Sequence, residues 1–306
     1  MADANPCLTR RSAVLGVPNL LFIEKLGEGG MAVVWKAWDT VNQRLVAVKV
    51  LNEESSRNPA DVKKFREEEQ HLEEIRDPGV VEAYDFGSAN GRWYMVMEYI
   101  DGYSFADLLK RKGRVSEEDC LLICESLSRS LARIWSGHGI VHCDIKPDNI
   151  MINTDGIVKL TDMGISYRYQ YLGDRADMLS EVVGTPAYIS PEQVCGDVEL
   201  DCRADIYSLG ATLYHLSTGR LLFPDRNSDD SMIAHCDNEG KAQDPRLIEP
   251  WLSDSFVKML EYMLVKDRDH RISSWEMLYE ICSQVERKVR FKSREDLSPS
   301  TLDIPK

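Results

Sequence analysis

Short apolar runs with a composition typical of β-strands recur along the first hundred positions. These runs are rich in β-branched and aromatic residues and are separated by glycine or polar turns. They cover residues 20–26, 33–38, 44–51, 80–86 and 92–99. One helix is predicted between the third and fourth runs. Asn58 is a suitable N-cap, Pro59 suits the first helical position, and the cluster 77–79 ends the helix.

The pattern changes to helices after Gly102. Ser116 can cap a helix whose apolar residues recur at four-residue spacing from Ile123 to Trp135. Three more helices are predicted at residues 204–218, 253–264 and 273–287. The stretch 225–246 is polar and predicted to be a loop.

Strands followed by helices predict an α+β protein with a small β-rich lobe joined to a larger, mainly helical lobe. The expected organisation is an N-terminal extension 1–19, a first lobe 20–101, a second lobe 102–287 and a flexible tail 288–306. The tail assignment follows from its charge and terminal position.

Composition narrows the choice of partners. The chain has 306 residues and a formal net charge of -14, which disfavours binding to nucleic acid phosphates or anionic lipid. We find no apolar run approaching the ~20 residues that span a bilayer, and no signal peptide. The eight cysteines include no CxxC pair, and Cys120 and Cys124 lack further zinc ligands. We therefore expect free thiols in a reducing cytoplasm.

Two motifs in the first lobe suggest phosphate binding, although each also has an ordinary structural explanation. The segment 27–33, Gly-Glu-Gly-Gly-Met-Ala-Val, lies between two strands, and glycines let a backbone approach phosphate oxygens. Alone, it could be a simple turn. Lys49 in the strand 44–51 could be a solvated surface lysine, or it could bind phosphates as a point charge.

The helix after Pro59 carries a candidate partner for Lys49. Its apolar face leaves Glu68 at one edge and Glu69 near the other. A carboxylate held against a core should be paired. Periodicity does not choose between these two glutamates, and either could simply reach water.

The strongest signal is the segment 142–149, His-Cys-Asp-Ile-Lys-Pro-Asp-Asn, followed by Asp-Met-Gly at 162–164. Polar residues at these spacings between apolar strands are hard to explain by packing. Asp144 can accept a proton from a substrate hydroxyl, and Lys146 can neutralise a transferred phosphoryl group. Asn149 and Asp162 offer the hard oxygen ligands that Mg²⁺ prefers.

With these motifs the sequence resembles the protein kinase family from about residue 20 to about residue 287. The resemblance implies the two-lobed kinase fold and transfer of the γ-phosphoryl group of ATP to a protein hydroxyl, with Mg²⁺, or Mn²⁺ in its place. It selects Glu68 over Glu69 as the partner of Lys49. It assigns nucleotide binding to Gly27, Gly29, Gly30, Val33, Ala47, Lys49, Met97, Glu98 and Ile100. It assigns catalysis to Asp144, Lys146, Lys49 and Glu68, and metal binding to Asn149 and Asp162.

The segment 184–192 extends the resemblance, since it looks like the end of a kinase activation segment. In the family, Glu192 would pair with Arg271, and Asp205 would anchor the catalytic loop. Lys146 together with Gly184-Thr185 resembles the serine/threonine pattern of bacterial eukaryotic-like kinases. Such kinases act on protein substrates in the cytoplasm, either as whole proteins or as cytosolic parts of membrane-anchored receptors.

Three positions depart from the family pattern: Ala32, Cys143 and Met163. Cys143 stands where the family has an arginine that pairs with a phosphate, and a thiol cannot make a charge-assisted bond of that kind. We therefore hypothesise activity that does not depend on activation-loop phosphorylation. The candidate acceptors in that region are Ser180, Tyr167, Tyr169 and Tyr171.

Two other functions are compatible with parts of the pattern. The three departures would suit a pseudokinase, a scaffold that binds nucleotide or partners without efficient transfer. A small-molecule kinase would share the motif around Asp144 but generally lacks the segment 184–192 and the Asp205 helix.

Overall fold

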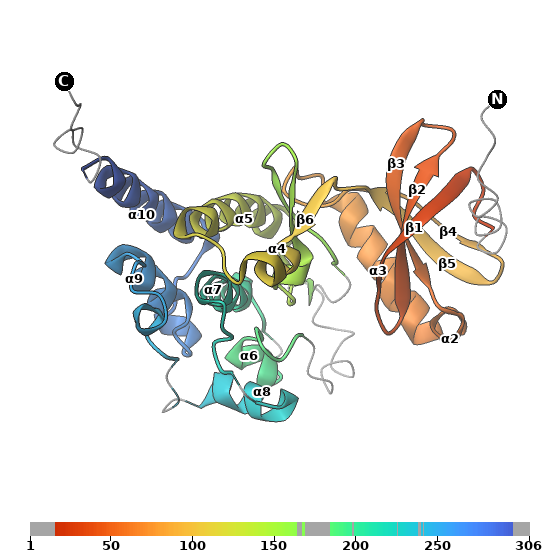
Figure 1. Ribbon diagram of the computed structural model, residues 1–306. Coiled ribbons are helices and arrows are strands. Elements are labelled where there is room, and N and C mark those ends of the chain that lie inside the picture. Colours follow the sequence, from red (N-terminus) through yellow and green to blue (C-terminus); the bar gives the residue numbers. More distant parts are fainter. Residues whose placement is uncertain are drawn as a thin grey trace, which may run out of the picture. The chain divides into compact units, whose positions relative to one another are not determined.

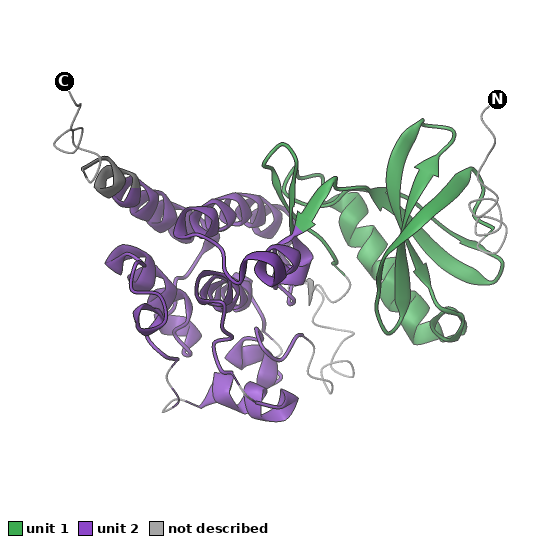
Figure 2. Ribbon diagram, in the orientation of Figure 1, with its two compact units in different colours: residues 1–103, 151–165 green, residues 104–150, 166–306 purple. Residues whose placement is uncertain are grey.

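The computed structural model describes residues 16–163, 167–168, 184–197, 199–224, 226–237, 240 and 242–295. The chain forms two compact units (Figure 2). The first comprises residues 1–103 and 151–165, and the second residues 104–150 and 166–306. Residues 151–165 thus return to the first unit after the chain has left it, which the linear order of the elements does not reveal. The predicted lobe bounds, 20–101 and 102–287, stay a prediction.

The first unit is built on a five-stranded antiparallel sheet in the order β1-β2-β3-β5-β4. Its strands are β1 (Leu20–Glu28), β2 (Ala32–Asp39), β3 (Arg44–Leu51), β4 (Ala83–Ala89) and β5 (Arg92–Glu98). Phe22, Val46 and Val48 are fully buried in its core. Alternation of side chains along β3 sets these valines on one face and Lys49 on the other.

Two helices, α2 (Glu53–Arg57) and α3 (Pro59–Glu74), follow β3. The Asn58 side chain caps α3 by accepting the N–H of Ala60, and Pro59 occupies the first turn, as the sequence predicted. The buried face of α3 includes Phe65 and Glu68, and α3 packs against β4 (Figure 1). This face carries Glu68 into the interior of the first unit.

The strand expected at residues 80–86 begins later, at Ala83, and continues to Ala89. Val80 and Val81 are buried, but Val80 makes only an isolated bridge to Leu160. The tight turn at Asn90 and Gly91, both with positive φ, sets the register of β4 on β5. The two buried valines form an apolar run like that of a strand, which explains why the predicted strand began before Ala83.

Near the points where the chain leaves and re-enters the first unit, a three-stranded sheet forms. It contains β6 (Gly102–Ser104), β8 (Ile150–Asn153) and β9 (Val158–Leu160) in the order β6-β8-β9. Val81 donates its N–H to the Leu160 carbonyl at 3.0 Å, which ties β9 to the segment before β4. Asp162 lies two residues after the end of β9.

The second unit is mainly helical. Its long helices are α5 (Glu117–His138), α7 (Cys202–Thr218) and α10 (Trp275–Glu295), and α5 packs against both others (Figure 1). The other helices are α4 (Phe105–Lys112), η1 (Pro147–Asn149), α6 (Pro191–Val194), α8 (Ser228–Cys236), η2 (Pro245–Leu247), α9 (Asp254–Met263) and η3 (Arg268–His270). Two short strands, β7 (Ile140–Val141) and β10 (Tyr167–Arg168), pair antiparallel. Together with the sheet of the first unit, this confirms the predicted α+β fold.

Several helices differ from expectation, since α2, α4 and α6 have no counterpart among the predicted helices. The predicted loop 225–246 contains α8, which is capped by Asn227 and buries Ser231, Ala234 and His235. These small and polar residues give no apolar periodicity, so the sequence pattern did not predict the helix. The helix α10 continues to Glu295, past the expected end at residue 287, because Lys, Arg and Glu are good helix formers. Among the described residues, no helix is long and apolar enough to cross a membrane.

Candidate functional site

In the first unit, Lys49 of β3 lies between two carboxylates. Its Nζ is 2.7 and 2.8 Å from the two carboxylate oxygens of Glu68, and 2.9 Å from Oδ1 of Asp162. The Lys49 and Glu68 side chains are 17% and 5% exposed, whereas that of Asp162 is 47% exposed. The structure thus brings Glu68, rather than Glu69, to Lys49.

Burial and charge act against each other in this cluster. Burial raises the pKa of Glu68 to about 7, although Lys49 opposes the shift. For Lys49, burial alone would lower the pKa, but the carboxylates of Glu68 and Asp162 hold it above its ordinary value. Lys49 therefore remains a cation at neutral pH, as a phosphate-binding group must.

The glycine segment forms the connection between β1 and β2. Gly29 donates its N–H to the Ala32 carbonyl at 2.8 Å. A Cβ atom added at Gly27 or Gly30 would meet no atom within 4 Å. Packing therefore does not require glycine at either position, and the surrounding space would allow a ligand to approach the backbone closely.

The remaining residues predicted to bind nucleotide lie on the same sheet or just after it. Val33 is in β2, Ala47 in β3, and Met97 and Glu98 at the end of β5. The Glu98 N–H donates to the Glu82 carbonyl at 2.8 Å, and its carboxylate pairs with Lys159 at 2.8 Å. This N–H is used within the first unit, so a ligand would have to bind other main-chain groups of residues 98–100.

In the second unit, three polar side chains gather around the Asp144 carboxylate. Lys146 Nζ lies 2.6 Å from Oδ2 of Asp144 and 2.8 Å from Oγ1 of Thr185. The Thr185 hydroxyl donates to Oδ1 of Asp144 at 2.6 Å. Asn149 donates from Nδ2 to the Asp144 carbonyl at 2.9 Å and to Oδ2 at 3.1 Å. The carboxylate is thus held by a cation, a hydroxyl and an amide.

Buried groups hold the backbone around this cluster. Asp205 in α7 accepts the N–H groups of His142 at 2.7 Å and Cys143 at 2.8 Å. Burial raises the pKa of Asp205 to about 6, against the opposing influence of His142 and the two N–H donors. Thr212, two turns further along α7, donates to the Ile145 carbonyl at 3.1 Å. Two side chains of α7, those of Asp205 and Thr212, therefore hold the backbone of residues 142–145 in place.

Gln193 is a supporting residue that the sequence analysis did not single out. Its Nε2 donates to the Cys143 carbonyl at 2.9 Å, while its Oε1 accepts from the N–H and hydroxyl of Ser190. Ser190 and Gln193 form a capping box at the start of α6. The Ser-x-x-Gln spacing could have revealed the cap, but not its contact with a loop fifty positions away.

Glu192 and Arg271 form a buried ion pair in the second unit. Arg271 Nη1 and Nη2 lie 2.6 and 3.0 Å from the two Glu192 oxygens, and the side chains are 0% and 6% exposed for Arg271 and Glu192. Arg271 also donates to the carbonyls of Val265, Arg203 and Lys266. The guanidinium is thus satisfied on all sides, which keeps a buried charge tolerable.

The positions that depart from the family pattern are buried. Cys143 is 4% exposed and has a φ of 67°, and its Sγ lies 3.7 Å from the Val141 carbonyl. Met163 is 1% exposed. Of the candidate phosphate acceptors, Ser180, Tyr169 and Tyr171 lie outside the described residues, as does Gly164, and for Tyr167 only the backbone is described.

The predicted metal ligands have suitable chemistry. The hydrogen bonds to Asp144 engage the nitrogen of the Asn149 amide, so the oxygen is the end that would coordinate a cation. Asp162 presents a partly exposed carboxylate. Each residue therefore offers an oxygen donor of the kind that a hard divalent cation such as Mg²⁺ or Mn²⁺ prefers.

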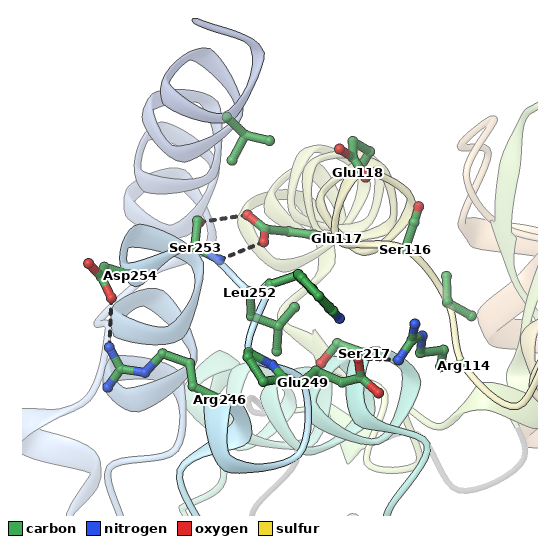
Figure 3. Close-up of a pocket in the computed structure, with 14 residues that line it drawn as sticks. Arg114, Ser116, Glu117, Glu118, Ser217, Arg246, Glu249, Leu252, Ser253 and Asp254 are labelled. Atoms are coloured by element: carbon green, nitrogen blue, oxygen red, sulfur yellow. Dashed lines mark hydrogen bonds and ion pairs between the residues drawn. The ribbon is translucent and has the colours of Figure 1, made fainter. Parts of the chain in front are cut away.

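A separate hollow of about 660 Å³ lies in the second unit, between the start of α5 and the loop before α9 (Figure 3). Glu117 accepts the N–H of Ser253 at 2.8 Å and its hydroxyl at 2.6 Å. Arg246 pairs with Asp254 at 2.6 Å, and Arg114 pairs with Glu249. These groups bond to one another, so the hollow does not offer the convergent chemistry seen around Asp144.

Comparison with known proteins identifies the family to which this fold and these motifs belong. The family model described as the protein kinase domain matches residues 20–282.

Several curated relatives are named serine/threonine-protein kinases. PknA of Corynebacterium glutamicum is 41% identical over 229 residues, which cover 73% of this chain and 48% of the relative. The kinase drp72 of Corynebacterium efficiens is 40% identical and covers 72% of this chain and 42% of the relative. PknB of Mycolicibacterium smegmatis is 39% identical and covers 64% and 32%, respectively. The chain spans less than half the length of these relatives.

Proposed function

The chain belongs to the protein kinase family, and on that premise we propose that it is an ATP-dependent protein serine/threonine kinase. The observation that carries the proposal is the Asp144 carboxylate, which a cation and an amide orient and which accepts a bond from the hydroxyl of Thr185 at 2.6 Å. A carboxylate held in this way can orient a second alcohol, that of a protein substrate, and accept its proton.

The residues of the chain would share the work as follows. Lys49, kept cationic by Glu68 and Asp162, would bind nucleotide phosphates. The backbone of residues 27–33 would cover them, and main-chain groups of residues 98–100 would bind the adenine. Asp144 would take the hydroxyl proton as the oxygen attacks, and Lys146 would neutralise charge on the phosphoryl group in transit.

Asn149 and Asp162 are the proposed ligands of Mg²⁺, or of Mn²⁺ in its place. When bound, the cation supplies positive charge that neutralises the phosphate oxygens. We propose that the chain acts on protein substrates in the cytoplasm. The partial coverage of the relatives is compatible with a catalytic domain that belongs to a larger protein.

Asp144→Asn tests the proposal directly. An amide has the shape of the carboxylate but cannot accept the proton, so radiolabelled phosphate transfer to a generic protein substrate should fall by about 10²–10⁴-fold. Asp155→Asn, at an exposed turn before β9, is the matched control and should leave the rate unchanged. Both variants should melt near the wild-type temperature. Full activity of a folded Asp144→Asn variant would remove the role that we give this residue.

A further inference from the structure

Two cysteines outside the proposed catalytic residues lie close together in the second unit. Sγ of Cys195, the residue that caps α6, is 3.9 Å from Sγ of Cys236, the last residue of α8, although 41 positions separate them. Cys195 is exposed and Cys236 is half-buried, whereas the other described cysteines are buried. A disulfide needs a sulfur separation of about 2 Å, so a modest approach of the two side chains would join them.

Several hydrogen bonds connect α8 to α6 and to neighbouring segments, and Figure 1 shows α6 and α8 side by side. Cys236 Sγ donates to the Pro191 carbonyl at 3.6 Å, and Ser231 of α8 donates to the Pro186 carbonyl at 3.2 Å. Lys266 Nζ donates to the Ala234 carbonyl at 2.8 Å and to the carbonyl of Gly240 at 2.6 Å. The end of α8 is therefore held from two directions, and the two thiols meet because of the fold.

We propose that Cys195 and Cys236 are an oxidation site that closes to a reversible intramolecular disulfide when the chain meets a hydroperoxide. The Cys195 thiolate attacks one peroxide oxygen, the O–O bond breaks, and an alcohol or water leaves. The resulting sulfenic acid is attacked by the sulfur of Cys236. The S–S bond forms as the S–O bond breaks and water leaves. The two thiols lose two electrons and two protons, which the peroxide takes up.

The surroundings assign different roles to the two sulfurs. Cys195 is the exposed member, so an oxidant reaches it first. Burial, reinforced by the neighbouring Cys195, raises the pKa of Cys236 to about 11. Cys236 therefore keeps its proton while Cys195 reacts with the oxidant, and it lies close enough to act as the resolving thiol.

The disulfide would also restrain the segment that precedes α6. Residues 184–190 lead directly into α6, and Pro186 in that segment contacts α8. A covalent link between α6 and α8 should therefore affect the docking of a protein substrate rather than the binding of nucleotide. This consequence rests on the proposed kinase function, whereas formation of the disulfide does not.

The test treats the reduced full chain with hydrogen peroxide, alkylates the remaining thiols and maps disulfides by peptide mass spectrometry without reduction. We expect a loss of two free thiols per chain, a cross-linked peptide pair containing Cys195 and Cys236, and full reversal by dithiothreitol. Cys195→Ser and Cys236→Ser should each abolish this pair. Cys202→Ser, which changes a buried thiol in the same unit, is the matched control and should retain it. Separate alkylation of both thiols after peroxide, or pairing of Cys195 with any other cysteine, would overturn the proposal.

The effect on docking is measured with initial rates of the oxidised and reduced chain. The KM for a protein substrate should change by about twofold or more, with the KM for ATP unchanged and no effect in Cys195→Ser. Equal protein KM values in both forms would refute the effect on docking. A chain without kinase activity would refute the proposed function but leave the disulfide result standing.

Discussion

At the scale of single residues, two adjacent glutamates of α3 differ sharply in their surroundings. Glu68 is buried and bonds Lys49 with both oxygens, whereas Glu69 is half-buried, and its burial, reinforced by the nearby Glu73, raises its pKa. Their neighbouring positions and identical chemistry make them a matched pair of mutation sites.

Glu68→Gln should lower kcat/KM for phosphate transfer, because a neutral amide holds Lys49 less firmly than a carboxylate does. A charge-assisted hydrogen bond is worth about 1.5–3 kcal/mol, which corresponds to a loss of about ten- to hundredfold. Glu69→Gln should change the rate little. Steady-state kinetics with varied ATP would measure both variants, and equal effects of the two substitutions would contradict the role given to Glu68.

Cys143 makes a second prediction at this scale. Its thiol is buried against the Val141 carbonyl, and it lacks the positive charge that would bind a phosphate on the activation segment. Removal of phosphate from the purified chain should therefore lower activity by less than about tenfold, which is about 1.4 kcal/mol. Phosphatase treatment with mass-spectrometric confirmation of dephosphorylation would measure this. A tenfold or greater loss would show that phosphorylation supports activity by another route.

At the scale of elements, α8 depends on a buried histidine. His235 Nδ1 bonds the Tyr207 hydroxyl at 2.8 Å, and its ring packs edge-on against Phe223. Burial lowers the pKa of His235 to about 4, and the nearby Lys266 adds to the effect. The unfolded chain keeps the ordinary pKa of 6.5, so it binds a proton in the range from pH 6.5 to 4 that the folded chain does not. The stabilising contribution of neutral His235 is therefore present above pH 6.5 and is lost as the pH falls towards 4.

His235→Gln should remove this dependence while retaining a group that can bond Tyr207. The wild-type chain should lose up to about 3 kcal/mol more of its free energy of unfolding than the variant between pH 7 and pH 4, at about 1.4 kcal/mol per pKa unit. Urea unfolding followed by circular dichroism would measure the difference. His270→Gln, at an exposed position in η3, serves as control and should behave like wild type. If the free energy of unfolding changes equally with pH in wild type and in His235→Gln, His235 is not the source of the pH dependence.

The elements also show how far local sequence pattern reaches. The strand containing Lys49, the caps at Asn58 and Ser116, and the spacing of polar residues from Asp144 to Asn149 are all local features, and they could be predicted. Periodicity could not choose Glu68 over Glu69, because the rotation of α3 against the sheet decides which edge is buried. The helix α8 escaped detection because it buries Ala234 and His235 rather than large aliphatic residues.

At the scale of the whole molecule, contacts distant in sequence set the geometry of the candidate site. The Thr185 bond to Asp144 spans 41 positions, and the bonds from Asp205 to the loop at residues 142–143 span more than 60. None of these distances could be read from local pattern, since only the folded chain brings the residues together. The resemblance to a family implied the contacts of Asp205 and of Glu192 with Arg271, whereas the hydrogen bonds of Thr185 and Gln193 appeared only in the structure.

The ion pair of Glu192 and Arg271, which spans 79 positions, should be among the strongest of these long-range ties. Arg271→Met leaves Glu192 buried without its partner and removes three bonds to carbonyls, so the free energy of unfolding should fall by about 3–5 kcal/mol. Arg246→Met removes a partly exposed arginine that bonds the carboxylates of Asp244 and Asp254, and it should lower the free energy of unfolding by no more than about 1 kcal/mol. Chemical denaturation would measure the free energy of unfolding of both variants. A larger loss for Arg271→Met would show that burial of an ion pair, rather than the number of ion pairs, determines its contribution.

The double variant Glu192→Gln/Arg271→Met decides where the loss originates. If most of it comes from stranding a buried carboxylate, replacing that carboxylate with a neutral amide should restore a measurable part of the stability lost in Arg271→Met. If the double variant is less stable than Arg271→Met by the full effect of Glu192→Gln alone, the two side chains act independently. The buried pair would then not be what holds α6, and with it residues 184–190, in place.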